Sequence, residues 1–244
     1  GGDYDYLTEL AVKCSASRIY PDYISAKKMR ENYKGCVFSP MGSRNFLSPF
    51  KDSSGNYKWE GRFNQGVVSI NLPQVALAAD KDEKRFFEEL DRRLEICFEA
   101  LMCRHYALLG TTSDISPVHW QYGAISRLAK GEKIDSLLKN GYSTLSLGYI
   151  GIYETTKLIK GVSQVEKEGH DFAIKLMKRL KETVEKWKDQ TGIGFTLYGT
   201  PAKSLCYRFA RIDKEQFGSI EGITDKGYYT NSYHLDSNEQ MSIE

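Results

Sequence analysis

A short stretch at residues 198–204 has the residue types of a phosphate-binding corner between a strand and a helix. Thr200 is a favoured N-cap residue, and Pro201 suits the first helical position because its missing N–H would be unpaired there anyway. At the carboxyl end of a parallel strand, such a corner presents free backbone N–H groups that bind anions. The same residues also suit a well-capped helix without a ligand, so composition alone leaves both interpretations open.

The loop at residues 40–49 places Ser43 after a glycine and before Arg44, where a small side chain can be exposed at a tip. A serine nucleophile needs a base beside it, and no histidine or carboxylate lies nearby in the sequence. The loop is therefore more simply interpreted as structural. A third stretch, residues 61–66, carries amide side chains such as Asn64, but alone it indicates only a turn.

Metal and disulfide chemistry receive little support from the cysteines and histidines. The five cysteines form no Cys-x-x-Cys pair, and the four histidines show no ligand spacing. Cys97 and Cys103 are six residues apart, which on a helix places them ~240° around the axis rather than on one face. We therefore expect neither a metal site nor a disulfide framework in this chain.

Composition favours a soluble, cytoplasmic protein with a packed core. The 244 residues allow one large domain or two small ones, and 41% of them are hydrophobic. The 34 basic and 32 acidic residues give a net charge of +2, which provides no reason to expect a nucleic-acid partner. No stretch approaches the ~18–20 apolar residues of a membrane span. The first five residues also lack the features of a signal peptide.

Hydrophobic periodicity predicts an α/β fold with a largely parallel sheet, because strands alternate with long helices. Helices are expected over residues 6–13, 25–33, 83–109, 121–128 and 164–188, with two more starting at residues 153 and 201. Strands are expected over residues 35–40, 66–72, 143–150 and 194–199. The long aperiodic stretch at residues 41–57 indicates a functional loop or disorder. Four strands are too few to close a barrel, so either the sheet is open or other segments complete it.

Eight blocks in order along the chain share their residues with one known family. They are residues 20–27, 39–42, 64–68, 97–104, 146–151, 200–202, 205–209 and 224–232. Together these blocks resemble the anaerobic, oxygen-sensitive ribonucleoside-triphosphate reductases, the glycyl-radical type of ribonucleotide reductase. The resemblance covers nearly the whole chain, which corresponds to a middle-to-late section of the large catalytic subunit. It implies that residues 1–244 form a single domain, the second half of a catalytic barrel.

The resemblance implies a ten-stranded α/β barrel with a finger loop threaded into its centre. The family's fingertip carries Met-Gly-Cys-Arg, whose cysteine becomes a thiyl radical and abstracts the 3′-hydrogen of the ribonucleotide. By position, Ser43 takes the place of that cysteine, and Asn64 matches an active-site asparagine. The resemblance also implies that Met41, Arg44 and Asn45, beside it on the finger, bind the substrate.

The resemblance also implies where the substrate phosphates bind and which partners the reaction needs. Thr200, Pro201 and Ala202 match the family's phosphate cradle. A glycyl radical made by a separate radical-SAM activase generates the thiyl radical, and formate commonly supplies the electrons. No cofactor is expected in this chain, because the ATP-cone, the first barrel half and the C-terminal zinc and glycyl-radical segment have no counterpart in it. The expected partners are a ribonucleoside triphosphate, the remaining reductase segments, the activase and a second copy of the subunit.

The family's function is the anaerobic reduction of ribonucleoside triphosphates to deoxyribonucleoside triphosphates for DNA replication. Ser43 departs from the family pattern, which has a cysteine at this position. A hydroxyl O–H bond is too strong for a glycyl radical to break, so serine cannot perform the radical step. Asn45 and Phe63 also replace residues usual in the family. We therefore expect the isolated chain to be inactive. The alternatives are a non-catalytic nucleotide-binding or complementing fragment of a split reductase, and an inert fragment of a degraded gene. The origin of Ser43, the base preference, the reductant and the oligomeric state stay open.

Overall fold

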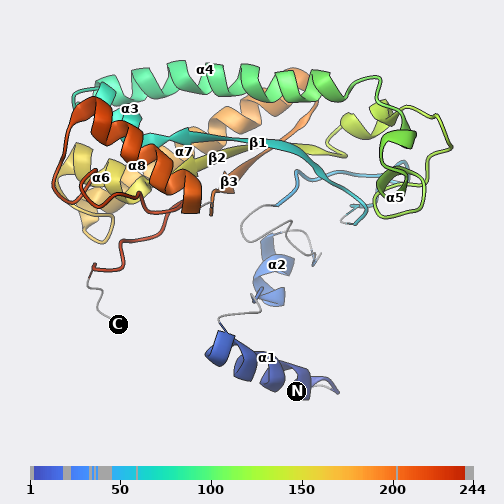
Figure 1. Ribbon diagram of the computed structural model, residues 1–244. Helices are drawn as coiled ribbons and strands as arrows, with labels where there is room; N and C mark the ends of the chain where they lie inside the picture. The colour runs from blue at the N-terminus through green and yellow to red at the C-terminus, as the bar shows by residue number, and fades with distance from the viewer. Residues whose placement is uncertain are drawn as a thin grey trace. The chain divides into compact units, whose positions relative to one another are not determined.

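A computed structural model of the chain describes residues 3–18, 23–32, 35, 37, 46–58, 60–201 and 203–239 (Figure 1). Contacts along the backbone divide the chain into two compact units, residues 1–39 and 40–244. The first unit contains helices α1 (Asp5–Arg18) and α2 (Ala26–Asn32), at the two positions where helices were predicted. No residue of α1 is buried. The single domain over residues 1–244 stays a prediction.

Three parallel strands form the centre of the second unit. They are β1 (Asn64–Asn71), β2 (Thr144–Ile150) and β3 (Gly194–Gly199), in the order β1-β2-β3. Ser69 of β1 pairs with Gly148 of β2, which pairs with Tyr198 of β3. The predicted α/β fold with a parallel sheet is confirmed. The further strand expected over residues 35–40 lies largely outside the described residues.

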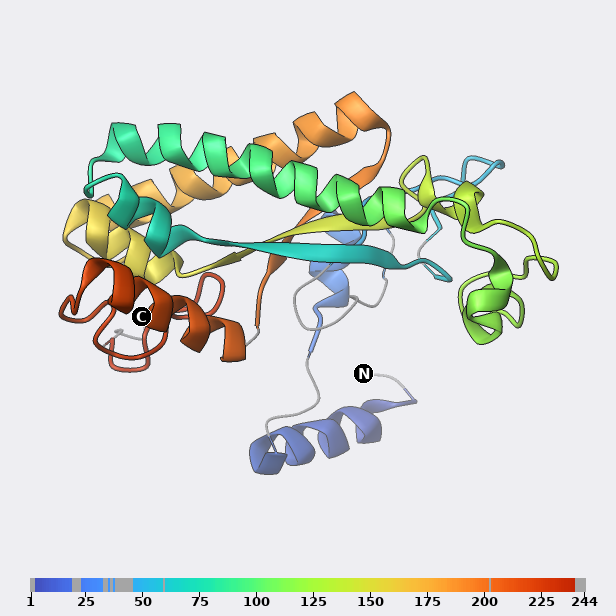
Figure 2. The same cartoon turned by 45° about the horizontal axis from the view of Figure 1, so that its top comes forward.

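The two faces of this sheet differ in chemistry, because successive side chains of a strand point to opposite faces. One face carries fully buried apolar side chains and packs against α4 (Glu83–Leu108) and α7 (Lys167–Thr191), which lie side by side over it (Figure 2). Its members include Leu145, Leu147 and Phe195. The opposite face, here called the polar face, carries Asn64, Ser69, Ser146, Gly148 and Thr196.

The long helices α4 and α7 bury the apolar stripes that the sequence predicted for them. The buried residues include Phe86, Leu90, Leu94 and Leu101 of α4, and Leu176, Leu180, Val184 and Trp187 of α7. Helix α4 starts after Asp82, whose Oδ1 accepts a hydrogen bond from the Arg85 backbone N–H at 2.8 Å. Among the helices that the structure describes, none combines the length and apolar character that a membrane crossing requires.

Three helices follow the carboxyl ends of the strands. They are α3 (Leu72–Ala78), α6 (Ile152–Lys160) and α8 (Lys203–Phe217). Helix α3 was not predicted, because Pro73 was taken as the end of a strand. In the structure Pro73 lies in the first helical turn, where its missing N–H is not needed, and the Asn71 side chain caps the turn by accepting from the Gln74 N–H at 3.3 Å.

Short helices and loops pack together near the amino ends of β1 and β2. They include η1 (Ser113–Ile115), α5 (Pro117–Trp120) and η2 (Ile134–Leu138), around a small core that contains Trp120 and Leu138. The helix predicted over residues 121–128 is wrong. The chain leaves α5 after Trp120, and Gly123 adopts φ +96°, a left-handed conformation that cannot continue a helix.

Replacing Leu147 by alanine should lower the free energy of unfolding by about 2–5 kcal/mol, because the buried side chain leaves a cavity on the core face. Ile174→Ala on α7 is the control, since that side chain is 43% exposed, and should change the free energy by about 0.5 kcal/mol or less. Urea denaturation followed by circular dichroism measures both. Equal losses in the two variants would contradict the placement of Leu147.

Candidate functional site

The structure describes three of the predicted site residues: Asn64, Thr200 and Pro201. The other five lie outside the described residues: Met41, Ser43, Arg44, Asn45 and Ala202. The finger loop and its catalytic position therefore stay predictions. The site can be built from the sheet that carries the described residues.

Asn64 starts β1 and joins a chain of polar side chains across the three strands. Its Nδ2 donates to the Ser146 hydroxyl of β2, and Ser146 Oγ lies 3.4 Å from Thr196 Oγ1 of β3. Asn64 Oδ1 accepts a hydrogen bond from the Gly66 backbone N–H at 2.7 Å. This contact lies where the pairing of β1 with β2 shifts register. The Asn64 amide is thus held on the polar face by bonds from both of its ends.

Thr200 closes the opposite end of the polar face. It follows β3, is 3% exposed, and places Oγ1 2.8 Å from Ser69 Oγ of β1. Between these two hydroxyls lies Gly148 of β2, and a Cβ there would collide with both oxygens. A glycine at residue 148 is therefore what allows Ser69 and Thr200 to meet across the central strand.

A pocket of about 450 Å³ opens beside this pair of hydroxyls. Its lining residues are Val67, Ser69, Tyr198, Thr200, Pro201, Leu205, Arg208 and Phe209. Helix α8 begins at Lys203, so Thr200 and Pro201 precede the helix by two or three residues and do not form its cap and first position as predicted. The Thr200 hydroxyl bonds with Ser69 across the sheet instead.

Asn64 and Thr200 share a face of the sheet but do not meet. Ser69, the partner of Thr200, lies five positions after Asn64, which at ~3.3 Å per residue is about 16 Å along the strand. The candidate site is thus an elongated polar strip. It has the Asn64 amide at the amino end and hydroxyl groups with a pocket at the carboxyl end.

Arg62 anchors the chain that enters the sheet from the segment before it. The side chain is 7% exposed, and its Nη2 donates to the carbonyl oxygens of Ser48 and Gly141 while Nε donates to that of Tyr142 at 2.8 Å. Burial lowers the pKa of the guanidinium to about 10. Arg62 therefore holds Ser48 and the loop before β2 together.

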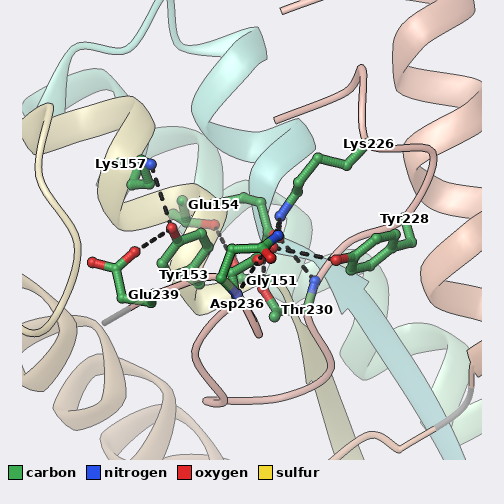
Figure 3. Close-up of polar contacts among 11 residues, drawn as sticks. Gly151, Tyr153, Glu154, Lys157, Lys226, Tyr228, Thr230, Asp236 and Glu239 are labelled. Carbon is green, nitrogen blue, oxygen red and sulfur yellow. Dashed lines mark hydrogen bonds and ion pairs between the residues drawn. The ribbon is translucent and has the colours of Figure 1, made fainter. Parts of the chain in front are cut away.

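The C-terminal segment is held against α6 by a buried ion-pair cluster (Figure 3). Glu154 of α6 is fully buried, and its Oε1 lies 2.8 Å from Lys226 Nζ, while its Oε2 accepts from the Thr230 hydroxyl at 2.6 Å. Lys226 Nζ also contacts Asp236 Oδ2 at 2.6 Å. Burial alone would lower the pKa of Lys226, but the two carboxylates outweigh it and raise the pKa.

A second buried carboxylate ties α8 to the neighbouring elements. Asp213 is fully buried and accepts hydrogen bonds from Asn71 Nδ2 at 2.9 Å, Gln74 Nε2 at 2.7 Å and Tyr229 Oη at 2.8 Å. Burial raises the pKa of the Asp213 carboxyl, and the three donors oppose that rise. Because Asn71 ends β1, this contact fixes α8 alongside β1 and beside the pocket.

Metal binding and thiol reactivity depend on how the histidine, cysteine and acidic side chains of the described residues are grouped and buried. Among the described residues, no group of three or more such side chains could hold a metal ion. Burial raises the pKa of the Cys97 and Cys206 thiols to about 11, so both stay protonated near neutral pH. These two cysteines therefore pack as small apolar side chains.

Several residues of the site were missed by sequence reasoning. Ser69 and Gly148 received no role because each falls inside a strand whose register with its neighbours was unknown. Arg208 lies in the block at residues 205–209 that resembles the family, but no function was assigned to it. An alignment of the three predicted strands in parallel register, by their small polar residues, would have placed Ser69 and Gly148 side by side and close to Thr200, which follows β3.

The whole chain, residues 1–244, matches the model of a family described as anaerobic ribonucleoside-triphosphate reductase. The protein of that name from Enterobacteria phage T4 is 42% identical over 246 residues, which cover 98% of this chain and 39% of that protein. The protein of that name from Escherichia coli strain K12 is 40% identical, over 99% of this chain and 34% of that protein. The chain thus spans somewhat more than a third of the length of these relatives.

Two solved structures share the fold. One is the anaerobic ribonucleotide reductase from Thermotoga maritima with MES in the active site, with a TM-score of 0.52 and 18% identity over 77% of this chain and 29% of that chain. The other is the same reductase in complex with dATP and CTP, with a TM-score of 0.51 and 18% identity over 73% and 28% of the two chains. At this identity the likeness concerns the fold alone.

Lys226→Met should lower the free energy of unfolding by about 3–5 kcal/mol, because Glu154 and Asp236 would stay buried without their cation. The pKa of Asp236 is lowered in the folded protein. The pair of Lys226 and Asp236 therefore contributes fully to the free energy of unfolding above the ordinary carboxyl pKa of ~3.9. This contribution is lost as the pH falls through the lowered pKa of Asp236.

Urea denaturation between pH 3 and pH 8 tests this expectation. The control is Lys84→Met, because the Lys84 side chain is 88% exposed and lies 3.9 Å from Glu88. We expect little change in the control. A Lys226→Met variant as stable as the control near neutral pH would show that the cluster does not hold the C-terminal segment.

Proposed function

Because the chain belongs to the anaerobic ribonucleoside-triphosphate reductase family, we propose that it forms part of the barrel in which ribonucleoside triphosphates are reduced to deoxyribonucleoside triphosphates. The family match over residues 1–244 and the 40–42% identity to curated relatives support this assignment. Since the chain spans little more than a third of those relatives, we propose the activity for an assembly that includes the remaining segments.

In this proposal the three strands belong to a ten-stranded barrel with the polar face turned inward. The apolar face is already covered by α4 and α7, as expected for the outer layer of a barrel. Among the strands that the structure describes, β1 and β3 lie at the edges of the sheet. An edge strand offers backbone groups to which a further strand can bond, which supports continuation of the sheet.

One observation carries the substrate assignment: the pocket where Ser69 and Thr200 meet above Gly148. Hydroxyl groups and the unpaired N–H groups at the start of a helix are donors suited to phosphate oxygens. We therefore assign the substrate phosphates to residues 200–202, directly before α8, with the Thr200 hydroxyl and the first backbone N–H groups of α8 as donors. The ribose would then lie along the polar face towards Asn64.

The proposal places hydrogen-atom abstraction at residue 43, with Met41, Arg44 and Asn45 beside the ribose. A thiyl radical at this position would be generated by a glycyl radical made by a radical-SAM activase, and formate would supply the electrons. We place that radical and the family's zinc in other segments of the assembly. With a serine at residue 43 the chain binds substrate and completes the barrel wall but does not start the radical reaction.

Ser43→Cys tests the catalytic assignment. The variant is combined with the remaining reductase segments, the activase and formate under anaerobic conditions, and deoxyribonucleotide formation is measured. We expect product with the variant and none above background with the parent chain, because only the thiol can pass the radical to the sugar. Electron paramagnetic resonance reports the glycyl radical. Its presence without product from Ser43→Cys would contradict the catalytic role and would favour a nucleotide-binding fragment.

Pro201→Glu tests the phosphate cradle independently of catalysis. A carboxylate in the pocket would repel the phosphates, so calorimetry should show at least about tenfold weaker binding of a ribonucleoside triphosphate. Gln216→Glu adds the same charge to an exposed position near the far end of α8 and should leave binding unchanged. Equal affinity of both variants and the parent chain for the nucleotide would show that the phosphates do not bind at residue 201.

A further inference from the structure

Arg208 is a pocket residue that the proposed function does not use. Among the described residues that line the pocket, it is the only one with a cationic side chain. Within the described part of the chain, no hydrogen bond or ion pair engages its guanidinium. The next arginine of the same helix differs, because Arg211 Nε lies 3.8 Å from Glu215 Oε1. The pocket therefore contains a positive charge that no other described residue neutralises.

The helix directs this charge towards the phosphate cradle. Leu205, Arg208 and Phe209 are spaced i, i+3 and i+4 on α8, so they share the face that lines the pocket. Side chains of a helix tilt towards its N-terminus, which here is the end next to Thr200 and Pro201. Arg208 lies five residues after the start of α8, which is about 7.5 Å along the helix axis.

The course of α8 shows which end of a bound nucleotide this charge meets. The helix starts beside Thr200, the partner of Ser69, and reaches Asn71 at Asp213, where Asn71 Nδ2 and Asp213 Oδ2 are 2.9 Å apart. It therefore runs along β1 in the direction that leads away from Asn64. A phosphate that contacts Arg208 would therefore lie farther from the proposed ribose position than the phosphates at residues 200–202.

We propose that Arg208 binds the terminal phosphate of the substrate and makes the pocket prefer nucleoside triphosphates over diphosphates. This inference rests on the proposed function, which places the phosphate chain at residues 200–202. The cradle offers neutral hydroxyl and N–H donors, which serve the phosphates nearest the ribose in either class of nucleotide. A third phosphate adds charge and extends towards α8, where a guanidinium forms paired, charge-assisted hydrogen bonds with it.

Calorimetry of the 244-residue chain with CTP and with CDP, without divalent cations, tests the inference. We expect the parent chain to bind CTP more tightly than CDP. Arg208→Gln should weaken CTP binding about tenfold or more and CDP binding less than about threefold, so that the preference is lost. Arg208→Lys keeps the charge without the paired geometry and should fall between the two. The matched control, Arg211→Gln, removes the same charge from α8 outside the pocket and should leave both affinities unchanged.

The outcomes separate the inference from the function on which it rests. If the parent chain binds both nucleotides and Arg208→Gln weakens them equally or not at all, Arg208 does not read the terminal phosphate and only this inference is overturned. If the parent chain binds neither nucleotide, the phosphate cradle itself is wrong and the inference fails with it. Circular dichroism of each variant confirms that a lost affinity is not a lost fold.

Discussion

The alternation of side chains across three parallel strands is the constraint on which the rest of the structure depends. It gives one sheet two incompatible surfaces: an apolar one that must be covered by α4 and α7, and a polar one of hydroxyl, amide and glycine positions. A shift of one residue in any strand would exchange the two surfaces. Burial of residues such as Leu147 and Phe195 therefore fixes the register that brings Ser69 to Thr200.

Charged groups buried around this sheet determine where the flanking segments attach. Arg62 holds the entry of β1 to the loop before β2, and Glu154 with Lys226 holds the C-terminal segment to α6. Asp213 fixes α8 beside β1. Each contact joins parts that are far apart in the sequence, and a buried charge without its partner is costly. The polar strip is thus bounded by segments whose positions are set by specific pairs rather than by apolar packing alone.

The parts of the fold that sequence reasoning predicted are those specified by local pattern. Apolar residues repeat at helical spacing in α4 and α7 and form a continuous strand-like run in β2. These three elements could therefore be predicted from the sequence. Helix α3 could not, because Pro73 suits both the end of a strand and the first turn of a helix. The meeting of Ser69 with Thr200 and the buried pair of Glu154 with Lys226 depend on tertiary contacts that no local pattern encodes. The family resemblance identified residues 64 and 200 without their geometry.

The central claim is that the polar face of this sheet, between Asn64 and the start of α8, is where the substrate lies. The most direct test is a crystal structure of the complete assembly with a bound ribonucleoside triphosphate. The account predicts phosphate oxygens within hydrogen-bonding distance, about 3.2 Å or less, of Thr200 or the first N–H groups of α8, with the ribose on the Asn64 side. A nucleotide bound productively on any other surface, with this strip filled by protein side chains, would contradict it.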